Sequence, residues 1–373
     1  MLRCSPPEFS ALADSSLLDL AAELVAIDSV NPDLIDGAAG ESDIAKFVVG
    51  WCRRAGLDVE LVGPPERPSV VAVARGSGGG RSLMLNAHLD TVGVAGMDAP
   101  LEPRVEDGRL HGRGSYDMKG ALAAILDAAA KVENLRGDVV VTAVADEEFA
   151  SIGTVTVLEH IRTDAAIVVE PTELKLAIAH KGFVGFELET QGVAAHGSRP
   201  HLGVDAIAKM GPVLVALKQL DEQLQGGSQH PLVGPGSIHA SLIEGGQEFS
   251  SYPARCLVSG ERRTIPGETV EQVETELRGL AGDAATRLTF SREPFEVAGD
   301  DALVRLVGRI AEEPDPVGVS FWADSGLIAA AGIPTVLYGP IGEGAHAQVE
   351  WVDLDSVERV RDVVLRTAVE WCG

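Results

Sequence analysis

The hydrophobic positions in the first half of the chain alternate between short apolar runs and longer segments with helical spacing. Apolar residues recur at helical intervals over residues 15–27 and 118–132, whereas residues 81–91 and 138–146 contain mostly continuous apolar runs. Such alternation, sustained to about residue 180, is typical of a sheet covered by helices. The pattern therefore predicts the first part of an α/β domain.

A different order of elements begins after residue 180. Strand-like and helix-like segments follow one another as β-α-β-β-α-β over residues 181–295. Thr269 and Gln272 supply a capping-box signal for the second of these helices. This order fits a ferredoxin-like α+β unit, so we expect residues 181–295 to form an inserted second domain.

Residues 296–373 return to the alternating α/β pattern and end in an amphipathic helix over residues 355–371. If residues 181–295 are an insertion, this last segment must pack back on residues 1–180. The first domain is then discontinuous. The length of 373 residues supports two domains, because single cores stop growing at roughly 250–300 residues.

The composition argues against several classes of partner and location. A net charge of −26 repels phosphate backbones and anionic membranes, so we expect no nucleic-acid partner. No apolar run approaches the ~20 residues needed to span a bilayer, and the N-terminus lacks a signal-peptide pattern. The cysteines are scattered without a C-x-x-C pair, which favours free thiols in a reducing, cytoplasmic compartment. They are Cys4, Cys52, Cys256 and Cys372.

Acidic and imidazole side chains stand where hydrophobic strand-like runs break into loops. These candidate metal ligands are His88, Asp117, Glu148, Glu170 and His346. Ligands in open α/β sheets gather at the carboxyl ends of the strands, so we expect these side chains to converge. A set of nitrogen and oxygen ligands suits zinc and tolerates cobalt or manganese. The sequence therefore predicts a hydrolytic site for two metal ions.

Two of these positions also have simpler interpretations. In H-L-D (88–90), one intervening residue leaves both side chains on one face of an extended segment, so we expect the Asp90 carboxylate to hold the second ring nitrogen of His88. The alternative is that His88 is only a polar residue at a strand end. Asp117 precedes a helix-like segment, and N-capping of that helix is its alternative role.

Asp146, Glu147 and Glu148 concentrate three acids at one predicted strand end. Their mutual repulsion must be offset by a cation or by altered protonation. Adjacent residues in a turn point in different directions, so one glutamate can bind metal while the other accepts a proton from a bound water. A solvated acidic loop is the alternative in a chain this acidic.

Seven motifs in order resemble the two-zinc family of acetylornithine deacetylase, succinyl-diaminopimelate desuccinylase, aminoacylase-1 and glutamate carboxypeptidase. They are LMLNAHLDTVG, GRGSYDMKGALAA, ADEEFASIGT, VVEPTEL, AAHGSRPHLGVDAI, ERRTIPGET and GAHAQVEW. The resemblance runs along nearly the whole chain. It implies a zinc-peptidase-like mixed sheet with helices on both faces, and an inserted ferredoxin-like domain that serves as lid and dimerisation domain.

The resemblance also implies a role for each candidate ligand. His88 and Glu170 would hold one metal ion, Glu148 and His346 the other, and Asp117 would bridge both. Glu147 would be the general base, taking a proton from a metal-bridging water and passing it to the leaving amine. The peptide bond after the bridging aspartate is often cis in this family, so we expect a cis bond between Asp117 and Met118.

The inserted domain of the family supplies further site residues. His196, in AAHGSRP, matches a histidine that reaches the active site of the partner subunit and stabilises the oxyanion, which implies a homodimer. Arg263 matches an arginine associated with the substrate carboxylate. Ser250 replaces an asparagine that commonly lies near the substrate, so substrate specificity is not transferable from the named enzymes. Taken without the resemblance, a lone histidine in a Gly/Ser-rich turn such as that of His196 is more often a surface residue, and the alternative role of Arg263 is a surface salt bridge on a strand.

The leading function is therefore metal-dependent hydrolysis of the amide bond of an N-acyl amino acid, as in a deacetylase. A dipeptidase or carboxypeptidase would use the same residues and differ in pocket shape. A non-catalytic metal- or peptide-binding relative is the alternative of another class, and the intact Glu147 argues against it. A serine hydrolase is disfavoured, because the chain has no G-x-S-x-G elbow.

Overall fold

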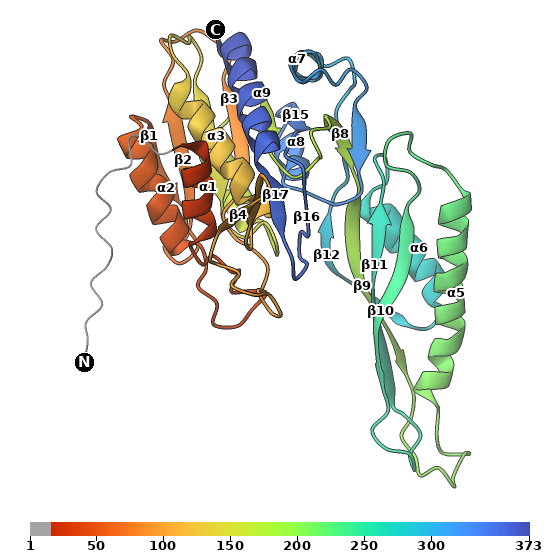
Figure 1. Cartoon of the computed structure of the whole chain (residues 1–373). Coiled ribbons are helices and arrows are strands. Elements are labelled where there is room, and N and C mark those ends of the chain that lie inside the picture. The colour runs from red at the N-terminus through yellow and green to blue at the C-terminus, as the bar shows by residue number, and fades with distance from the viewer. Residues whose placement is uncertain (1–15) are drawn as a thin grey trace, which may run out of the picture. The chain divides into compact units, whose positions relative to one another are not determined.

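The computed structural model describes residues 16–373, so Cys4 and the N-terminal segment before Ser16 lie outside the described residues (Figure 1). The chain divides into two compact units. The first contains the residues up to Ile178, Val297–Pro316 and Ala323–Gly373, and the second contains Ala179–Glu296 and Val317–Trp322.

The assignment of all of 296–373 to the first domain was wrong for Val317–Trp322. The indole nitrogen of Trp322 donates a hydrogen bond to the carbonyl of Glu293 at 3.2 Å, and its ring lies edge-on to the ring of His180. Both partners belong to the second unit. The contacts of the Trp322 side chain thus place Val317–Trp322 with the second unit, although the sequence pattern of this segment resembles that of the first.

A mixed sheet forms the centre of the first unit. Six consecutive strands of this nine-stranded sheet are β1 (Asp58–Val62), β2 (Ser69–Ala74), β6 (Val139–Val144), β3 (Leu83–His88), β7 (Ala166–Val168) and β15 (Thr335–Leu337), in that order. The pairs β1–β2 and β2–β6 are antiparallel, and β6–β3, β3–β7 and β7–β15 are parallel. Every residue of β3, β6 and β7 is buried, as expected for parallel strands covered on both faces.

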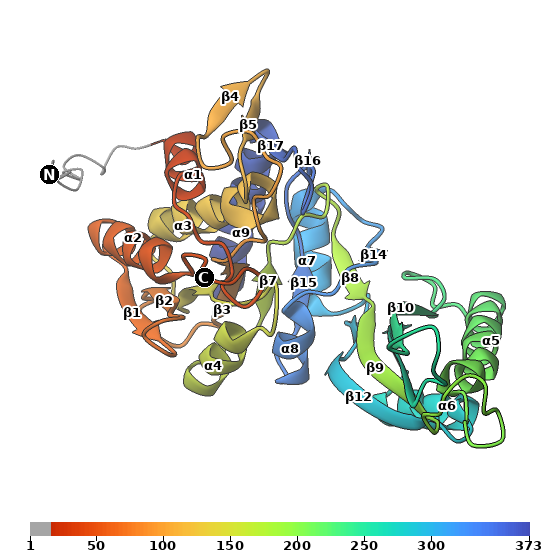
Figure 2. The same cartoon turned by 90° about the horizontal axis from the view of Figure 1, so that it is seen from below.

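Helices cover both faces of this sheet, as predicted (Figure 2). They are α1 (Leu17–Val25), α2 (Ser42–Arg54), α3 (Gly120–Lys131), α4 (Ile152–His160), α7 (Ala302–Ala311), α8 (Ser325–Ala330) and α9 (Leu354–Cys372). Helix α3 contacts α1 and α9, whereas α4 contacts α8. Within residues 16–373, every helix is too short or too polar to span a bilayer.

A small antiparallel sheet in the first unit brings the C-terminal loop to the middle of the chain. Its order is β16-β17-β5-β4, formed by Gly342–Glu343, Trp351–Asp353, Arg109–His111 and Arg104–Glu106. Trp351 pairs with His111 across β17 and β5. This pairing fixes the loop that carries His346 and Glu350 beside the segment that follows His111.

The second unit has the predicted order of elements. They are β9 (Gly182–Gln191), α5 (Ala206–Gly226), β10 (Ser237–Gly245), β11 (Arg255–Thr264), α6 (Val270–Ala281) and β12 (Ala285–Arg292), and the antiparallel sheet has the order β10-β11-β9-β12. Alternate residues of β9 pack with α5 and α6 in one core that includes Phe186, Met210 and Leu277. The capping box of Thr269 and Gln272 is present. The remaining short strands are β8 (Ala177–His180), β13 (Phe295–Glu296) and β14 (Val317–Val319).

We expect the central strand β3 to tolerate truncation far less than the edge strand β1. Leu85→Ala removes a fully buried side chain and should lower the free energy of unfolding by about 2–5 kcal/mol. Leu61→Ala, on β1 with 49% of the residue exposed, is the control and should cost less than about 1 kcal/mol. Urea unfolding of both variants measures the difference, and equal losses would contradict this view of the core.

Candidate metal centre

The side chains named as candidate ligands converge in the first unit. They are His88, Asp117, Glu148, Glu170 and His346. They form two groups that share Asp117, one with His88 and Glu170 and the other with Glu148 and His346, and the ligand atoms of each group lie within 4.8 Å of one another. His88 ends β3, and Glu148 and Glu170 follow β6 and β7. The parallel strands thus deliver three ligands to one edge of the sheet.

Asp117 lies between the two histidines. Its Oδ1 is 3.0 Å from His88 Nε2, and its Oδ2 is 3.4 Å from His346 Nε2. His346 Nε2 is also 3.0 Å from Glu148 Oε2, and His88 Nε2 is 3.9 Å from Glu170 Oε1. Each oxygen of Asp117 therefore faces a different histidine, which is the arrangement a bridging carboxylate requires.

The cluster has an excess of negative charge. Burial, with the neighbouring carboxylates, raises the pKa of Glu147 and Glu170 well above the usual range, and burial also raises the pKa of Glu148. Hydrogen bonds to Asp117 and Glu148 raise the pKa of His346 to about 10. These carboxylates favour any bound positive charge, and nitrogen and oxygen donors suit a divalent ion such as zinc. The residues present therefore fit a metal centre.

Asp90 is the partner of the second ring nitrogen of His88, but the hydrogen bond is made with its backbone carbonyl and its carboxylate is only at ion-pair distance. His88 Nδ1 lies 2.9 Å from the backbone carbonyl oxygen of Asp90 and 3.7 Å from its Oδ1. The carboxylate instead accepts hydrogen bonds from the backbone amides of Glu147 and Glu148 at 3.1 and 3.2 Å, and from Asn31 Nδ2 at 2.7 Å. The carboxylate of Asp90 is thus hydrogen-bonded to the loop after β6 rather than to the ring of His88.

Asp117 is not an N-cap of α3, because Lys119 occupies that position. Asp117 lies in a distorted turn, Ser115–Lys119, with φ −118° and ψ 90°, and its peptide bond to Met118 is cis as expected. Gly114, which precedes the turn, has φ 79°, a conformation that favours glycine.

Glu350, which lies within the GAHAQVEW motif but was given no role from the sequence, holds this turn in place. Its buried carboxylate accepts hydrogen bonds from the amides of Gly114, Tyr116 and Asp117 at 3.0–3.1 Å, and from Arg113 Nη1 at 2.6 Å. Motif spacing gave no sign of these partners, which lie more than 230 positions away along the chain.

A further buried carboxylate, Asp324, was not identified from the sequence. Thr154 Oγ1 donates to its Oδ2 at 2.5 Å, and only 1% of the residue is exposed. Burial raises the pKa of Asp324 to about 6, against the lowering effect of that hydrogen bond. The charge of Asp324 in turn contributes to the raised pKa of Glu147 and Glu170.

The remaining predicted site residues belong to the second unit. His196 is exposed, and its Nδ1 lies 2.8 Å from Ser198 Oγ. The amide of Gly197 donates to the carbonyl of Ser250 at 2.6 Å, so the His196 turn and the Ser250 loop are adjacent. Arg263 lies apart from them, on β11, where its Nε is 2.5 Å from Glu261 Oε1.

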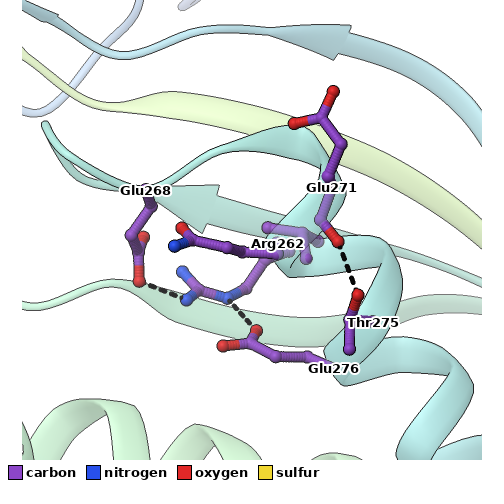
Figure 3. A pocket seen from close by; sticks show the side chains of 7 residues that line it. Arg262, Glu268, Glu271, Thr275 and Glu276 are labelled. Atoms are coloured by element: carbon purple, nitrogen blue, oxygen red, sulfur yellow. Dashed lines mark hydrogen bonds and ion pairs between the residues drawn. The ribbon is translucent and has the colours of Figure 1, made fainter.

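Neighbouring Arg262 lines a pocket of the second unit between β11 and α6, with Glu268, Glu271 and Glu276 (Figure 3). Its guanidinium is fully buried and donates to Glu268 Oε1 at 2.6 Å, to Glu276 Oε2 at 3.4 Å and to the carbonyl of Arg263. All its nitrogens are thus engaged in holding the fold. Of the two adjacent arginines, only Arg263 keeps a partly exposed head for a ligand.

Comparisons with known proteins identify a family and several similar proteins. Residues 84–370 match the model of peptidase family M20/M25/M40. An acetylornithine deacetylase from Myxococcus xanthus is 33% identical, over 94% of this chain and 96% of that protein. The solved structure of a tripeptidase from Staphylococcus aureus is 19% identical with a TM-score of 0.78, covering 95% of this chain and 98% of that chain. A dinuclear metal-binding M20 peptidase from Bacillus subtilis is 17% identical with a TM-score of 0.70, covering 95% and 97%.

Removing the Glu350 carboxylate should weaken metal binding. Glu350→Ala leaves Arg113 and three backbone amides without their acceptor, so the turn that carries Asp117 loosens, and we expect zinc affinity to fall about 10–100-fold. Competition with a chromogenic chelator measures the affinity. Glu343→Ala, at an exposed position of β16, is the control and should bind zinc normally. Unchanged affinity in Glu350→Ala would contradict the holding role.

Proposed function

Because the chain belongs to peptidase family M20/M25/M40, and is thus a metal-dependent hydrolase, we propose that it cleaves the amide bond of an N-acyl amino acid. The observation that carries this proposal is the pair of ligand groups joined by Asp117, with Glu147 beside them. The similarity to an acetylornithine deacetylase extends over nearly the full length of both chains and supports a deacylase.

The ligand assignment is part of the proposal. His88 and Glu170 would hold one metal ion, Glu148 and His346 the other, and Asp117 both. When bound, two zinc ions would polarise the substrate carbonyl and lower the pKa of water. Cobalt or manganese would also suit these donors.

Glu147 is the proposed general base. It neighbours the ligand Glu148 but belongs to neither ligand group, so its carboxylate is free for proton transfer. Burial and the charge of Glu170 raise its pKa, which makes it a better proton acceptor than an exposed glutamate. Glu147 takes a proton from the attacking water and delivers it to the leaving amine.

The second unit would complete the site in a homodimer. We assign oxyanion stabilisation to His196 of the partner subunit, binding of the substrate carboxylate to Arg263, and a place near the substrate to Ser250. β10 is an edge strand of its sheet with exposed Leu242 and Ile243, at 66% and 56%. An unpaired, apolar edge of this kind favours association with a second copy.

Small peptides are the alternative substrates, since a dipeptidase or carboxypeptidase needs the same ligands and base. The tripeptidase and the dinuclear peptidase named above share the fold alone, so they do not decide between the two. A panel of N-acetyl, N-formyl and N-succinyl amino acids beside dipeptides separates deacylase from peptidase. Stoichiometric metal binding without turnover on any substrate would favour a non-catalytic relative.

Glu147→Gln should lower kcat about 10²–10⁴-fold, because the amide accepts no proton. Zinc stoichiometry should not change, since Glu147 is not among the ligands. Free-amine release by chelator-stripped protein, with and without added zinc or cobalt, measures turnover. Glu159→Gln, at an exposed position of α4, is the matched control and should behave as the wild type. A fully active Glu147→Gln enzyme would refute the assigned base.

A mixture of subunits tests the shared site. His196→Ala and Glu147→Gln should each be nearly inactive alone, and their mixture should recover up to about a quarter of wild-type activity, because half of the dimers are mixed and each has one intact site. Subunit exchange is checked by tagging one variant and recovering the other with it. Exchange without recovery would show that each site is built from a single chain.

A further inference from the structure

A buried cluster of polar side chains lies behind the loop that carries Glu147 and Glu148. Arg67 donates from Nε and Nη2 to the carboxylate of Glu41 at 2.6 and 2.8 Å, and from Nη2 to Asp146 Oδ1 at 2.8 Å. Asn31 Nδ2 donates to the same Asp146 oxygen at 3.0 Å. Glu41 and Asn31 are completely buried, Asp146 is 1% exposed, and the Arg67 side chain is 11% exposed.

These contacts restrain three consecutive residues. The amide of Asp146 donates to Glu41 Oε1 at 3.1 Å, and the amides of Glu147 and Glu148 donate to the two oxygens of Asp90. The backbone of this loop is thus held by two buried carboxylates from other segments: Glu41, the N-cap of α2, and Asp90, two residues after the end of β3. Asn31 joins the two, because it also donates to Asp90 Oδ2 at 2.7 Å.

Asp146 has a left-handed backbone conformation, which aspartate tolerates but glycine adopts with less strain. Its φ is 67°, in the left-handed region where glycine has no steric penalty. If the loop required only this conformation, glycine would suit the position better. The side chain of Asp146 instead receives Arg67 and Asn31, so it ties the strained point of the loop to the buried cluster.

A buried arginine among carboxylates adds little to the free energy of unfolding. The desolvation of the charges offsets much of their attraction, and apolar residues of similar volume would often stabilise a fold equally well. The fork-shaped guanidinium instead supplies direction: Nε and Nη2 bond Glu41 and Asp146, while Nη1 donates to Asp33 on the more exposed side.

We propose that Arg67, Glu41, Asn31 and Asp146 form a positioning cluster that fixes the orientation of the Glu147 carboxylate for proton transfer. This rests on the proposed role of Glu147. None of the four residues is a candidate metal ligand. The cluster acts through the backbone of the Asp146–Glu148 loop. A displacement of a proton-transfer group by about 1 Å costs on the order of 100-fold in rate.

Two substitutions of Asp146 separate positioning from backbone conformation. Asp146→Gly suits the left-handed φ but removes the acceptor for Arg67 and Asn31, so we expect kcat to fall about 10–100-fold, with KM changed less than about threefold and zinc stoichiometry retained. Asp146→Asn keeps Oδ1 as an acceptor and also tolerates this φ, so it should stay within about fivefold of the wild-type kcat.

A full kcat in Asp146→Gly, while Glu147→Gln is inactive, would overturn the positioning role and leave the proposed function intact. An active Glu147→Gln would instead refute the base itself. Loss of zinc in parallel with kcat in Asp146→Gly, measured by chelator competition, would also overturn the proposal, because the cluster would then support the ligand Glu148 rather than Glu147.

Arginine variants provide an independent test from the other side of the cluster. Arg67→Met should lower kcat about 10–100-fold with zinc stoichiometry retained, and Arg67→Lys should recover only part of the loss, because one ammonium does not replace the bidentate fork. Arg75→Met is the matched control: Arg75 also bonds two carboxylates, of Asp58 and Asp138, but at the surface, and kcat should not change. Equal kcat in Arg67→Met and Arg75→Met would overturn the proposal. If Arg67→Met does not fold, the comparison of Asp146→Gly with Asp146→Asn decides instead.

Discussion

Buried carboxylates that repel one another are concentrated where β3, β6 and β7 end, and much of the first unit is arranged to keep them there. Burial and mutual charge raise the pKa of Glu147, Glu148 and Glu170, so these groups bind positive charge strongly. Bringing them together costs free energy in the absence of a counter-charge. That cost is what gives the site its affinity for divalent ions, since a cation relieves the repulsion that the fold imposes.

Three buried acids outside the two ligand groups hold the segments that carry the candidate ligands Asp117 and Glu148 and the proposed base Glu147. Glu350 fixes the Asp117 turn, Asp90 binds the amides of Glu147 and Glu148, and Glu41 binds the amide of Asp146. Each carboxylate accepts backbone N–H groups, and Glu350 and Glu41 are also paired with Arg113 and Arg67. Their charges are thus compensated outside the ligand groups, while the candidate ligand side chains stay available for a cation. This layer explains why loops, rather than rigid elements, can present a precise set of ligands.

The two units divide the proposed chemistry between them. The first contains the ligands and the general base, and the second contains His196, Ser250 and Arg263, whose proposed roles concern the substrate. Amide cleavage is common to the family, whereas the identity of the acyl group depends on the shape of the surroundings. On the proposed roles, the replacement of a common asparagine by Ser250 would affect specificity and leave the hydrolytic machinery unchanged.

The sequence by itself determined the α/β alternation, the β-α-β-β-α-β order of the second unit and the five side chains that converge, because period and strand ends are local properties of the chain. It did not determine their partners. The Asp90 carboxylate was expected to hold His88 but binds the loop after β6, while the Asp90 carbonyl contacts His88. Asp117 was expected, in one alternative, to cap a helix whose N-cap is Lys119. Arg67 and Asn31 carried no motif, yet they bond Asp146 from 79 and 115 positions away. Only the tertiary structure decides such contacts, since a buried donor bonds whichever acceptor the packing of distant segments brings within reach.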